Sequence, residues 1–292
     1  MEEIKVSGFV NILKPTGMTS SDVVCKVKKI LKTKKVGHLG TLDPAASGVL
    51  PVSIGKATKF FDYFLTKDKE YYAIVQFGIE TDTLDSFGQI ISKDNKVVNE
   101  EQIKSVLPKF IGEINQIPPK YSAIKINGKK ACDLARKDID FEIKTRQVKI
   151  FNIELLDEIQ KNRFLFKVNC SAGTYIRTLL FDIAKELGTI ATVPVIIRTK
   201  SGRFDLSSAT TLEELEENKK VLSLREVFED YKEIEVNDEI AKKLINGIKI
   251  SASEINEDLS DLDFFITNKK SIIGLYRVQD CDVKRIVFLY EN

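Results

Sequence analysis

The sequence predicts an α+β fold, in which a largely antiparallel mixed sheet is flanked by helices and a small β domain lies behind it. Segments with the two-residue alternation of strands and segments with the 3.6-residue period of helices follow one another along the chain. Near Tyr231 the composition shifts, and short strands with turn signals dominate from there on. Because 292 residues are enough for two domains, we expect one over 1–231 and a second over 232–292.

The first elements are a strand, a turn and a helix. Residues 9–13 are a short apolar strand, and Pro15 and Gly17 predict a turn after it. Thr19 and Asp22 fit a capping box, and apolar residues then recur at helical spacing as far as Leu31. The lysines of this helix lie mostly off its apolar face. One helix therefore combines a buried stripe with a cationic surface.

The middle of the chain is predicted as strands and one longer helix. Residues 49–54 and 69–77 are predicted strands. Residues 81–88 form a turn region, after which residues 89–92 are expected to pair with the strand over 69–77 as an antiparallel hairpin. A helix begins near Asn99, and Pro108 is expected to kink or end its first segment.

The second half begins with an extended segment. Pro118 and Pro119 hold it extended, and Asn127-Gly128 is a strong turn signal. Residues 146–156 and 164–170 are strands, and the helix that follows is expected to end at Gly188. A capping pair at 211 and 214 starts a short acidic helix, and strands are expected at 272–278 and 285–290, with a turn at 246–247.

The composition excludes several classes of site. The four cysteines are far apart with no C-x-x-C pair, and a single histidine excludes histidine-rich zinc sites. The sequence contains neither G-x-G-x-x-G nor a P-loop, so no cofactor is expected. The N-terminus lacks the apolar region of a signal peptide, and no apolar run is long enough to span a membrane. A cytoplasmic protein is therefore expected.

Charge is distributed unevenly along the chain. Residues 1–66 contain ten Lys and Arg against five Asp and Glu, whereas residues 232–292 contain nine against twelve. Six lysines fall within residues 26–35, with no acidic residue among them. A localised basic surface favours a phosphate-rich partner, although a lysine run can also be an ordinary solvated helix surface.

Residues 37–51, with the sequence GHLGTLDPAASGVLP, have the features of a reactive loop. They contain the only histidine, His38, and Asp43, whose backbone is restricted by Pro44. Glycines at 37, 40 and 48 allow tight turns and a close approach to a ligand. A carboxylate on a stiff turn beside a cationic surface could act as a nucleophile toward a polyanion. The simpler alternative makes Asp43 the N-cap of a helix.

The stretch G-T-L-D-P in this loop resembles the signature of the TruB family of tRNA pseudouridine-55 synthases, in which this aspartate is catalytic. Further blocks between residues 8 and 210 are similar to family motifs: NILKPTGMTS, K-x-Y followed by TDTLD, PPKYSAIK and GTYIRTL. The resemblance implies the pseudouridine-synthase fold, with an insertion around 117–145 that grips the tRNA. It extends only loosely to 232–292, as a PUA-like domain. Ala131-Cys132 stands where Leu-Tyr is frequent in the family.

The resemblance also implies roles for individual residues. Asp43 is the catalytic carboxylate, Tyr71 stacks on the target base and assists proton transfer, and Asp85 contacts the base edge. Tyr175 and Ile196 line the pocket, and Lys14 supports the structure or contacts RNA. Without the resemblance, simpler assignments apply. Tyr71 would be an ordinary strand aromatic, and Tyr175 and Ile196 would be core residues. Asp85 would be a turn residue, and Lys14 an exposed turn residue.

Arg177 falls in the first turn of its helix, where the helix dipole disfavours a cation. A carboxylate from elsewhere would offset this cost. The family block that contains this arginine pairs it with the catalytic aspartate, so we predict an Arg177–Asp43 ion pair. The alternatives are an exposed arginine or a structural pair unrelated to catalysis.

The implied reaction detaches C1′ from N1 of uridine and joins it to C5, and it transfers no electrons. Asp43 could attack C1′, attack C6 or remove a sugar proton, and the sequence leaves these alternatives open. The uridine must leave a folded RNA loop, which costs about a few kcal/mol of unstacking. His38 could occupy the vacated space, although alone it would be assigned as a turn residue. The lysine surface would bind phosphates.

Three other functions fit parts of the sequence. A non-catalytic RNA-binding or RNA-folding protein needs only the basic surface and the insertion. An RNA-guided synthase of ribosomal RNA shares the aspartate loop but needs partner proteins. A glycoside hydrolase normally needs two facing carboxylates, and the loop of Asp43 offers no second one. We expect a monomeric enzyme that acts on the T-arm of tRNA without an obligatory protein partner.

Overall fold

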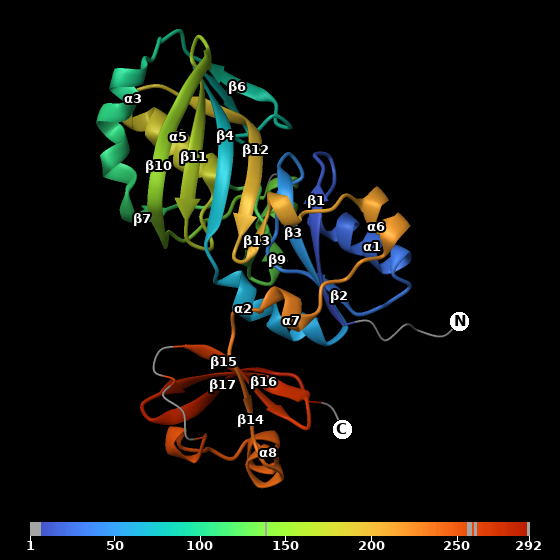
Figure 1. Ribbon diagram of the computed structural model, residues 1–292. Helices are drawn as coiled ribbons and strands as arrows, with labels where there is room; N and C mark the ends of the chain where they lie inside the picture. Colours follow the sequence, from blue (N-terminus) through green and yellow to red (C-terminus); the bar gives the residue numbers. More distant parts are fainter. Residues whose placement is uncertain (1–6, 138, 256–258, 260–261, 291–292) are drawn as a thin grey trace.

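The computed structural model describes residues 7–137, 139–255, 259 and 262–290. A nine-stranded sheet and a four-stranded sheet organise the chain, and Figure 1 shows them as two bodies, the smaller formed by C-terminal residues. This architecture confirms the predicted α+β fold with a small C-terminal β unit. Within the described ranges, no helix has the length and apolar character needed to cross a membrane.

The large sheet is mixed. Its strands are β1 (Gly8–Lys14), β2 (Val36–His38), β3 (Ser47–Ile54), β4 (Lys69–Phe77), β7 (Gly112–Gln116), β10 (Arg146–Gln160), β11 (Arg163–Cys170), β12 (Ala191–Ser201) and β13 (Phe204–Asp205). The order is β1-β3-β12-β4-β11-β10-β7, with β2 paired to β3 and β13 paired to β12. Among the described strands of this sheet, β12 and β3 are the pair that runs in parallel. The predicted largely antiparallel sheet is confirmed.

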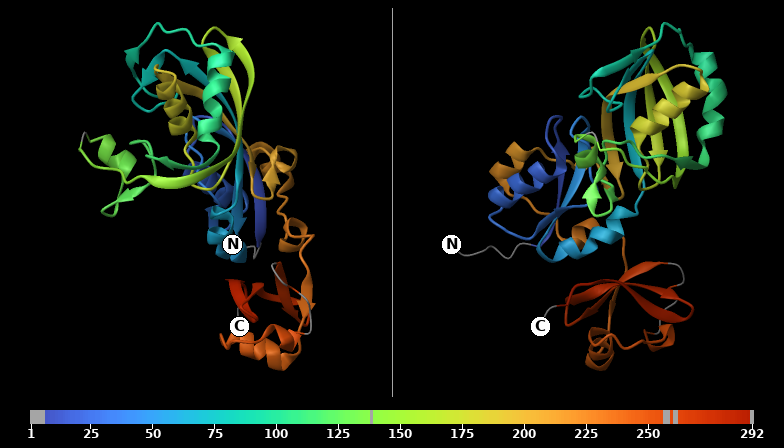
Figure 2. Two further views of the ribbon diagram at one scale, coloured as in Figure 1. Left: turned by 90° about the vertical axis from the view of Figure 1, so that its left-hand side faces the viewer. Right: turned by 180° about the vertical axis from the view of Figure 1, so that it is seen from behind.

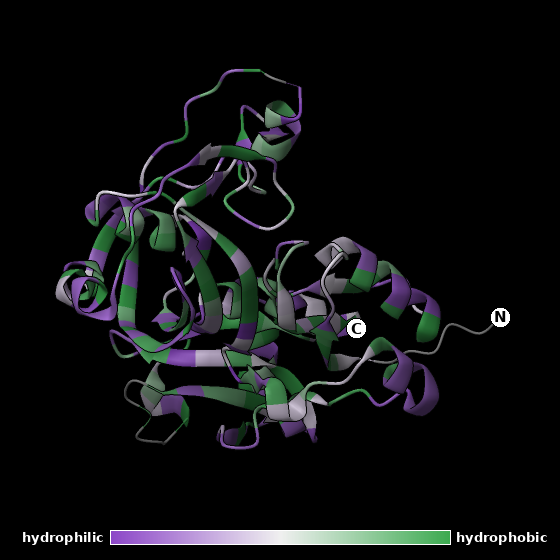
Figure 3. Cartoon of the chain, turned by 90° about the horizontal axis from the view of Figure 1, so that it is seen from above, coloured by the Kyte–Doolittle hydropathy of each residue, from purple (hydrophilic) through white to green (hydrophobic). Residues whose placement is uncertain are grey.

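Helices cover one face of this sheet. α3 (Glu100–Val106) and α5 (Ile176–Glu186) lie on the same side of the sheet, and α1 (Ser20–Ile30) and α6 (Leu212–Asn218) lie together beside β1 and β3 (Figure 1). Residues of β4 and β11 alternate between buried and partly exposed, as expected for strands with one covered face. Hydrophobic and hydrophilic residues alternate along the strands in Figure 3.

Most predicted boundaries are confirmed. Capping boxes start α1, α3 and α6. Pro108 falls in a 3₁₀ turn at Leu107–Phe110 that follows α3, and Gly188 follows α5 with a φ of 69°. Asn127 and Gly128, both with positive φ, form the turn between β8 (Lys125–Ile126) and β9 (Lys129–Lys130).

Two strand predictions need correction. Residues 90–93, strand β6 (Ile90–Lys93), pair with β5 (Ile79–Thr81) and not with the strand over 69–77. The reason is that β4 already has β11 and β12 on its two edges, and Gly78, with a φ of 85°, turns the chain out of the sheet. Strand β12, in the middle of the sheet, was not predicted at all.

The segment around 117–145 projects from the end of the sheet. It contains the β8–β9 hairpin and α4 (Ala131–Ala135), and it leaves β7 and returns to β10. In the left-hand view of Figure 2 this segment extends to one side of the large body, away from the sheet. Its two ends are therefore anchored on neighbouring strands while its middle is free to contact a ligand.

The small body contains β14 (Glu233–Glu235), β15 (Asp263–Asn268), β16 (Ser271–Gln279) and β17 (Asp282–Phe288), paired in that order. The predicted strand over 272–278 lies within β16, and the one predicted over 285–290 starts earlier, at Asp282. α8 (Asp238–Ile245), which was not predicted, packs against β15 and β16. Gly247 follows this helix with a φ of 74°, at the predicted turn.

An aromatic cluster joins the two bodies. Phe228 is buried against Phe9, Phe60 and Phe64 of the large body, with ring centroids 5.2–6.2 Å away. On its other side, Phe265 of the small sheet lies 5.3 Å from Phe228, centroid to centroid. Aromatic pairs at these distances stabilise a core beyond their buried area. The two bodies therefore share one core at this point.

We expect Phe228→Ala to lower the free energy of unfolding by about 3–5 kcal/mol, because it leaves a cavity between the bodies. Urea denaturation measures this change. As a control, Phe151→Ala removes an exposed ring on β10 and should change the stability by less than about 0.5 kcal/mol. Equal losses in the two variants would contradict the assignment of a shared core.

Candidate active site

The loop that carries Asp43 connects β2 to β3. No helix follows Asp43; instead, Pro44 and Ala45 form a turn that is closed by a hydrogen bond from the amide of Ala46 to the carbonyl oxygen of Asp43, 3.1 Å long. The helix-cap alternative for Asp43 is therefore wrong. The turn leaves the Asp43 side chain 33% exposed, so the carboxylate points outward.

Ser20, at the start of α1, holds this loop from one side. Its buried hydroxyl accepts a hydrogen bond from the amide of Leu42 (2.9 Å) and donates one to the carbonyl oxygen of Leu42 (3.0 Å). The amide of Gly17 donates to the carbonyl oxygen of Pro44, 2.8 Å away. The residues on both sides of Asp43 are thus fixed by contacts with the turn and helix after β1.

We expect Ser20→Ala to slow catalysis about tenfold, since a small displacement of a reacting group is costly, while the Kd for RNA stays unchanged. Single-turnover kinetics and a binding titration separate the two effects. Ser20→Thr, which keeps the hydroxyl, should recover most of the rate. Thr267→Val, which removes a buried hydroxyl from the small sheet, is the control, and a similar loss of rate there would refute the positioning role.

Arg198 holds the loop from the other side, and the sequence did not single it out as a site residue. It is almost fully buried, and its guanidinium donates to the carbonyl oxygens of Gly40 (3.2 Å), Thr41 (3.1 Å) and Val49 (2.8 Å). Gly48 lies so close to the backbone of Arg198 that a Cβ would sit 2.2 Å from its carbonyl oxygen. We expected this glycine to permit the close approach of a ligand. Instead, it permits the close approach of β12.

The predicted Arg177–Asp43 ion pair is present. The guanidinium of Arg177 lies 2.5 Å from Oδ2 of Asp43. Two further hydrogen bonds fix Arg177, one to the carbonyl oxygen of Thr83 (2.7 Å) and one to that of Tyr121 (3.1 Å). Among the described residues, Oδ1 of Asp43 has no hydrogen-bond partner. One carboxylate oxygen is therefore oriented and the other remains available.

Asp85 is the second carboxylate on Arg177. Its Oδ2 lies 3.3 Å from the guanidinium, and its side chain is only 8% exposed. Its Oδ1 accepts hydrogen bonds from the hydroxyl of Thr83 (2.7 Å) and from the amide of Phe87 (3.0 Å). Asp85 therefore stabilises its own turn and pairs with the site arginine, so the turn assignment and the site assignment are both compatible with its position.

A cavity of about 330 Å³ opens on one side of Asp43. Tyr71, Tyr175 and Ile196 line it, as the sequence predicted, together with Lys69 and Arg198. β4 and β12 place Tyr71 directly opposite Arg198 in the sheet. Burial raises the pKa of Tyr71 to about 12, although the charge of Arg198 opposes this shift. The phenol is therefore protonated at neutral pH and can donate a hydrogen bond.

Gln116 fixes Tyr175, a contact that the sequence did not reveal. The side-chain amide of Gln116 donates to the carbonyl oxygen of Tyr175 (3.0 Å), and its oxygen accepts from the amide of Tyr175 (2.8 Å). Tyr175 is the N-cap residue of α5 and has no side-chain cap of its own. Gln116, at the end of β7, thus orients the start of the helix that carries Arg177.

A second cavity, of about 560 Å³, lies on the other side of Asp43. His38 and Asp85 line it, with residues of the α1 start and with Cys132 and Arg136 of the insertion. Burial lowers the pKa of His38, and the charge of Arg198 adds to this effect. Nδ1 of His38 is buried without a hydrogen-bond partner among the described residues. The imidazole is neutral and has an unused polar atom beside Asp43.

Lys14 lies beneath this site and not on its surface. It is fully buried, and its ammonium donates to the carbonyl oxygens of Pro15 and Met18, each 2.8 Å away. Burial lowers the pKa of Lys14 to about 8. The exposed-turn alternative is wrong. Of the two roles that the resemblance implied, the position fits support of the Met18 turn and not direct contact with RNA.

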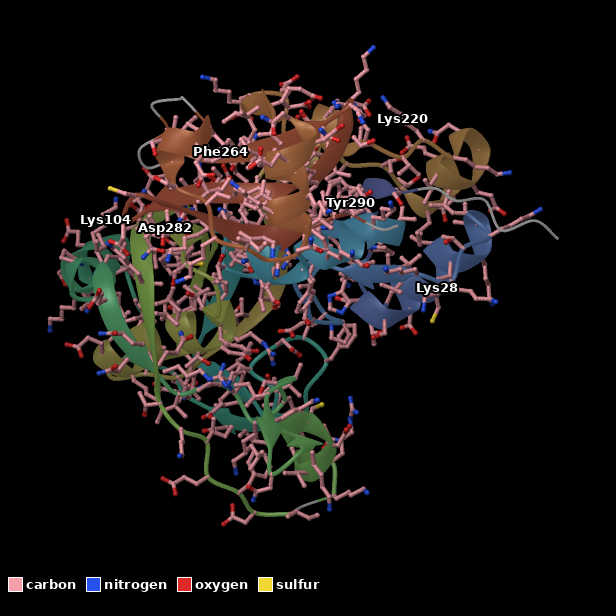
Figure 4. All side chains as sticks on the ribbon, turned by 90° about the horizontal axis from the view of Figure 1, so that it is seen from below. Lys28, Lys104, Lys220, Phe264, Asp282 and Tyr290 are labelled. Carbon is pink, nitrogen blue, oxygen red and sulfur yellow. The ribbon has the colours of Figure 1, made fainter. Side chains whose placement is uncertain are left out.

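The second cavity lies between the start of α1 and the insertion. The N-terminal end of α1 lines it, and the exposed lysines of this helix, Lys26 and Lys29 among them, follow. Figure 4 shows Lys28 on α1, on the opposite side of the molecule from Lys104 on α3. The insertion adds Arg136. The site thus combines a carboxylate, a protonated phenol, two cavities and nearby basic residues. This combination suits chemistry on a polyanion.

The sequence and the fold have known relatives. Residues 28–176 match the family model described as TruB family pseudouridylate synthase (N terminal domain). The tRNA pseudouridine synthase B of Clostridioides difficile is 46% identical, over 87% of this chain and 88% of its own, and that of Clostridium tetani is 40% identical, over 92% and 95%. Among solved structures, one chain of a Cbf5-Nop10-Gar1 complex superposes with a TM-score of 0.71 at 28% identity, covering 97% of this chain and 84% of its own.

Proposed function

This chain belongs to the TruB family of pseudouridylate synthases, and we propose that it converts uridine 55 in the T-loop of tRNA into pseudouridine. The observation that carries this proposal is the position of Asp43. Its carboxylate is paired with Arg177 on one oxygen, lies at the junction of two cavities, and is held on a loop that Ser20 and Arg198 fix from both sides.

In our proposal the target uridine enters the first cavity. Tyr71 stacks on the base and assists proton transfer, and Tyr175 and Ile196 form the surrounding wall. Asp43 then acts on the uridine without a metal or an organic cofactor. Attack at C1′, attack at C6 and removal of a sugar proton all start from the same ionised carboxylate. Arg177 orients this group, which lowers the barrier because fewer degrees of freedom remain to be fixed.

The paired-carboxylate chemistry of glycoside hydrolases does not fit this site. Asp85 is the acid that shares Arg177 with Asp43, and its two oxygens are occupied by Arg177, Thr83 and the amide of Phe87. It cannot deliver a proton to a leaving group while it is held in this way. Asp85 lines the second cavity and not the first, so in this proposal it acts on the target base through Arg177 and Asp43 and not by the direct contact with the base edge that the resemblance implies.

His38 fits the space that the flipped nucleotide leaves. It lines the second cavity, and burial lowers its pKa, which favours the uncharged ring. The lysines of α1 and the insertion supply phosphate contacts from either side. We assign residues 1–231 to the catalytic domain, with the RNA-gripping insertion around 117–145, and 232–292 to a PUA-like domain. We further propose a cytoplasmic monomer that needs no protein partner.

The decisive experiment incubates the purified protein with a bare tRNA T-arm transcript and maps pseudouridine in the product. Conversion of uridine 55 alone supports the proposal. A protein that binds the transcript and leaves it unmodified would instead be a non-catalytic RNA-binding protein. Activity that requires a guide RNA and partner proteins would assign it to the RNA-guided synthases.

A further inference from the structure

Phe87 occupies an unusual position for a phenylalanine. Its side chain is 59% exposed, and it lines the same cavity as Asp43, Arg177 and His38. Tyr121 is the other aromatic residue in this lining, and it is only partly exposed. What sets this exposed ring apart is that it shares a cavity with the reactive carboxylate, where a ligand could cover it and remove its apolar surface from water.

Hydrogen bonds and ion pairs connect the loop that carries Phe87 to the catalytic residues. The amide of Phe87 donates to Oδ1 of Asp85 (3.0 Å), and Asp85 pairs with Arg177, which in turn pairs with Asp43. The hydroxyl of Thr81 donates to the carbonyl oxygen of Asp85 (2.9 Å). A short chain of polar contacts therefore holds the backbone of Phe87 relative to the carboxylate of Asp43.

The surroundings of the ring fit a nucleobase. Arg136, on the insertion, lines the same cavity and can bind a phosphate or stack on a base. The hydroxyl-bearing residues at the start of α1, Thr19, Ser20 and Ser21, form another part of the lining. Bases of single-stranded RNA stack on exposed aromatic rings, and each such contact contributes substantially to affinity.

We propose that Phe87 is a stacking platform for a nucleotide next to the target uridine, with the neighbouring base in the second cavity while the uridine occupies the first. This inference rests on the proposed function. The stack would hold the RNA loop open on both sides of Asp43 and would fix the register of the target nucleotide, so Phe87 is a positioning residue and takes no part in the chemistry.

The test uses Phe87→Ala in the full chain and a set of T-arm stem-loop RNAs, each lacking one loop base other than the target. We expect the Kd for intact RNA to rise about tenfold. For one RNA without a base next to the target, the wild-type protein and Phe87→Ala should bind equally well. If the loss persists with every abasic RNA, or never appears, Phe87 does not stack on a base.

Three comparisons make the result specific. Phe87→Tyr should bind like the wild type, whereas Phe87→Leu, which is apolar but not aromatic, should bind like Phe87→Ala. Ile90→Ala removes an exposed apolar side chain from the same hairpin, and an equal loss there would refute the proposal. Circular dichroism verifies folding. If wild-type protein makes no pseudouridine in the T-arm, the proposed function fails; if it does and the base dependence is missing, only this inference fails.

Discussion

Asp43→Asn should abolish pseudouridine formation. We expect the single-turnover rate to fall by roughly 10⁴-fold or more, the size of effect seen when a group that takes part in bond making is removed. The asparagine amide has nearly the same shape, and Asp85 continues to pair with Arg177. The architecture of the site is therefore retained while the reactive oxygen is lost.

Binding distinguishes loss of chemistry from loss of structure. Because phosphate contacts supply most of the affinity, the Kd for tRNA should remain within about threefold of wild type. Asp62→Asn, an exposed acid on α2 (Phe61–Leu65), is the matched control and should keep full activity. A rate for Asp43→Asn above about one hundredth of wild type would exclude Asp43 as the reacting group.

Arg177→Met should have the second-largest effect, on catalysis and on stability together. Arg177 is 3% exposed and holds two carboxylates. Its removal frees Asp43 to rotate, and we expect the single-turnover rate to fall about 10³-fold, a typical loss when a reacting group is no longer oriented. The Kd for RNA should change far less, because Arg177 lies within the protein and not on the RNA-facing lysine surface.

The stability loss has a separate cause. Without Arg177, Asp85 becomes a buried charge with no cationic partner, which should lower the free energy of unfolding by about 3–5 kcal/mol. Adding Asp85→Asn to Arg177→Met should recover much of this stability in a urea titration, but not the catalytic rate. Lys104→Met breaks an exposed pair with Glu100 and should cost less than about 1 kcal/mol. Equal losses of rate and RNA affinity in Arg177→Met would contradict its assigned role.

The sequence predicted the local elements well because their causes lie within a few residues. Capping boxes at Thr19, Asn99 and Thr211 depend on side chains that bond to nearby backbone amides. The turn at 127–128 depends on two residue types that readily adopt positive φ. It did not predict β12, since Pro194 interrupts the pattern of a strand. In the structure this proline lies at a register shift between Thr192 and Val195, in the pairing of β12 with β4. The strand therefore depends on its neighbour β4 and not on its own sequence pattern.

By itself, then, the sequence determined the α+β class, the aspartate loop with its family resemblance, and the pairing of Arg177 with Asp43. The tertiary structure alone decided how that loop is held. Arg198 reaches carbonyl oxygens about 150 positions earlier in the chain, Ser20 reaches across 22 positions, and Gln116 across 59. Such contacts exist only after the strands have packed. A buried polar group needs a hydrogen-bond partner, and the tertiary structure decides which groups are close enough to serve. No local sequence pattern specifies that partner.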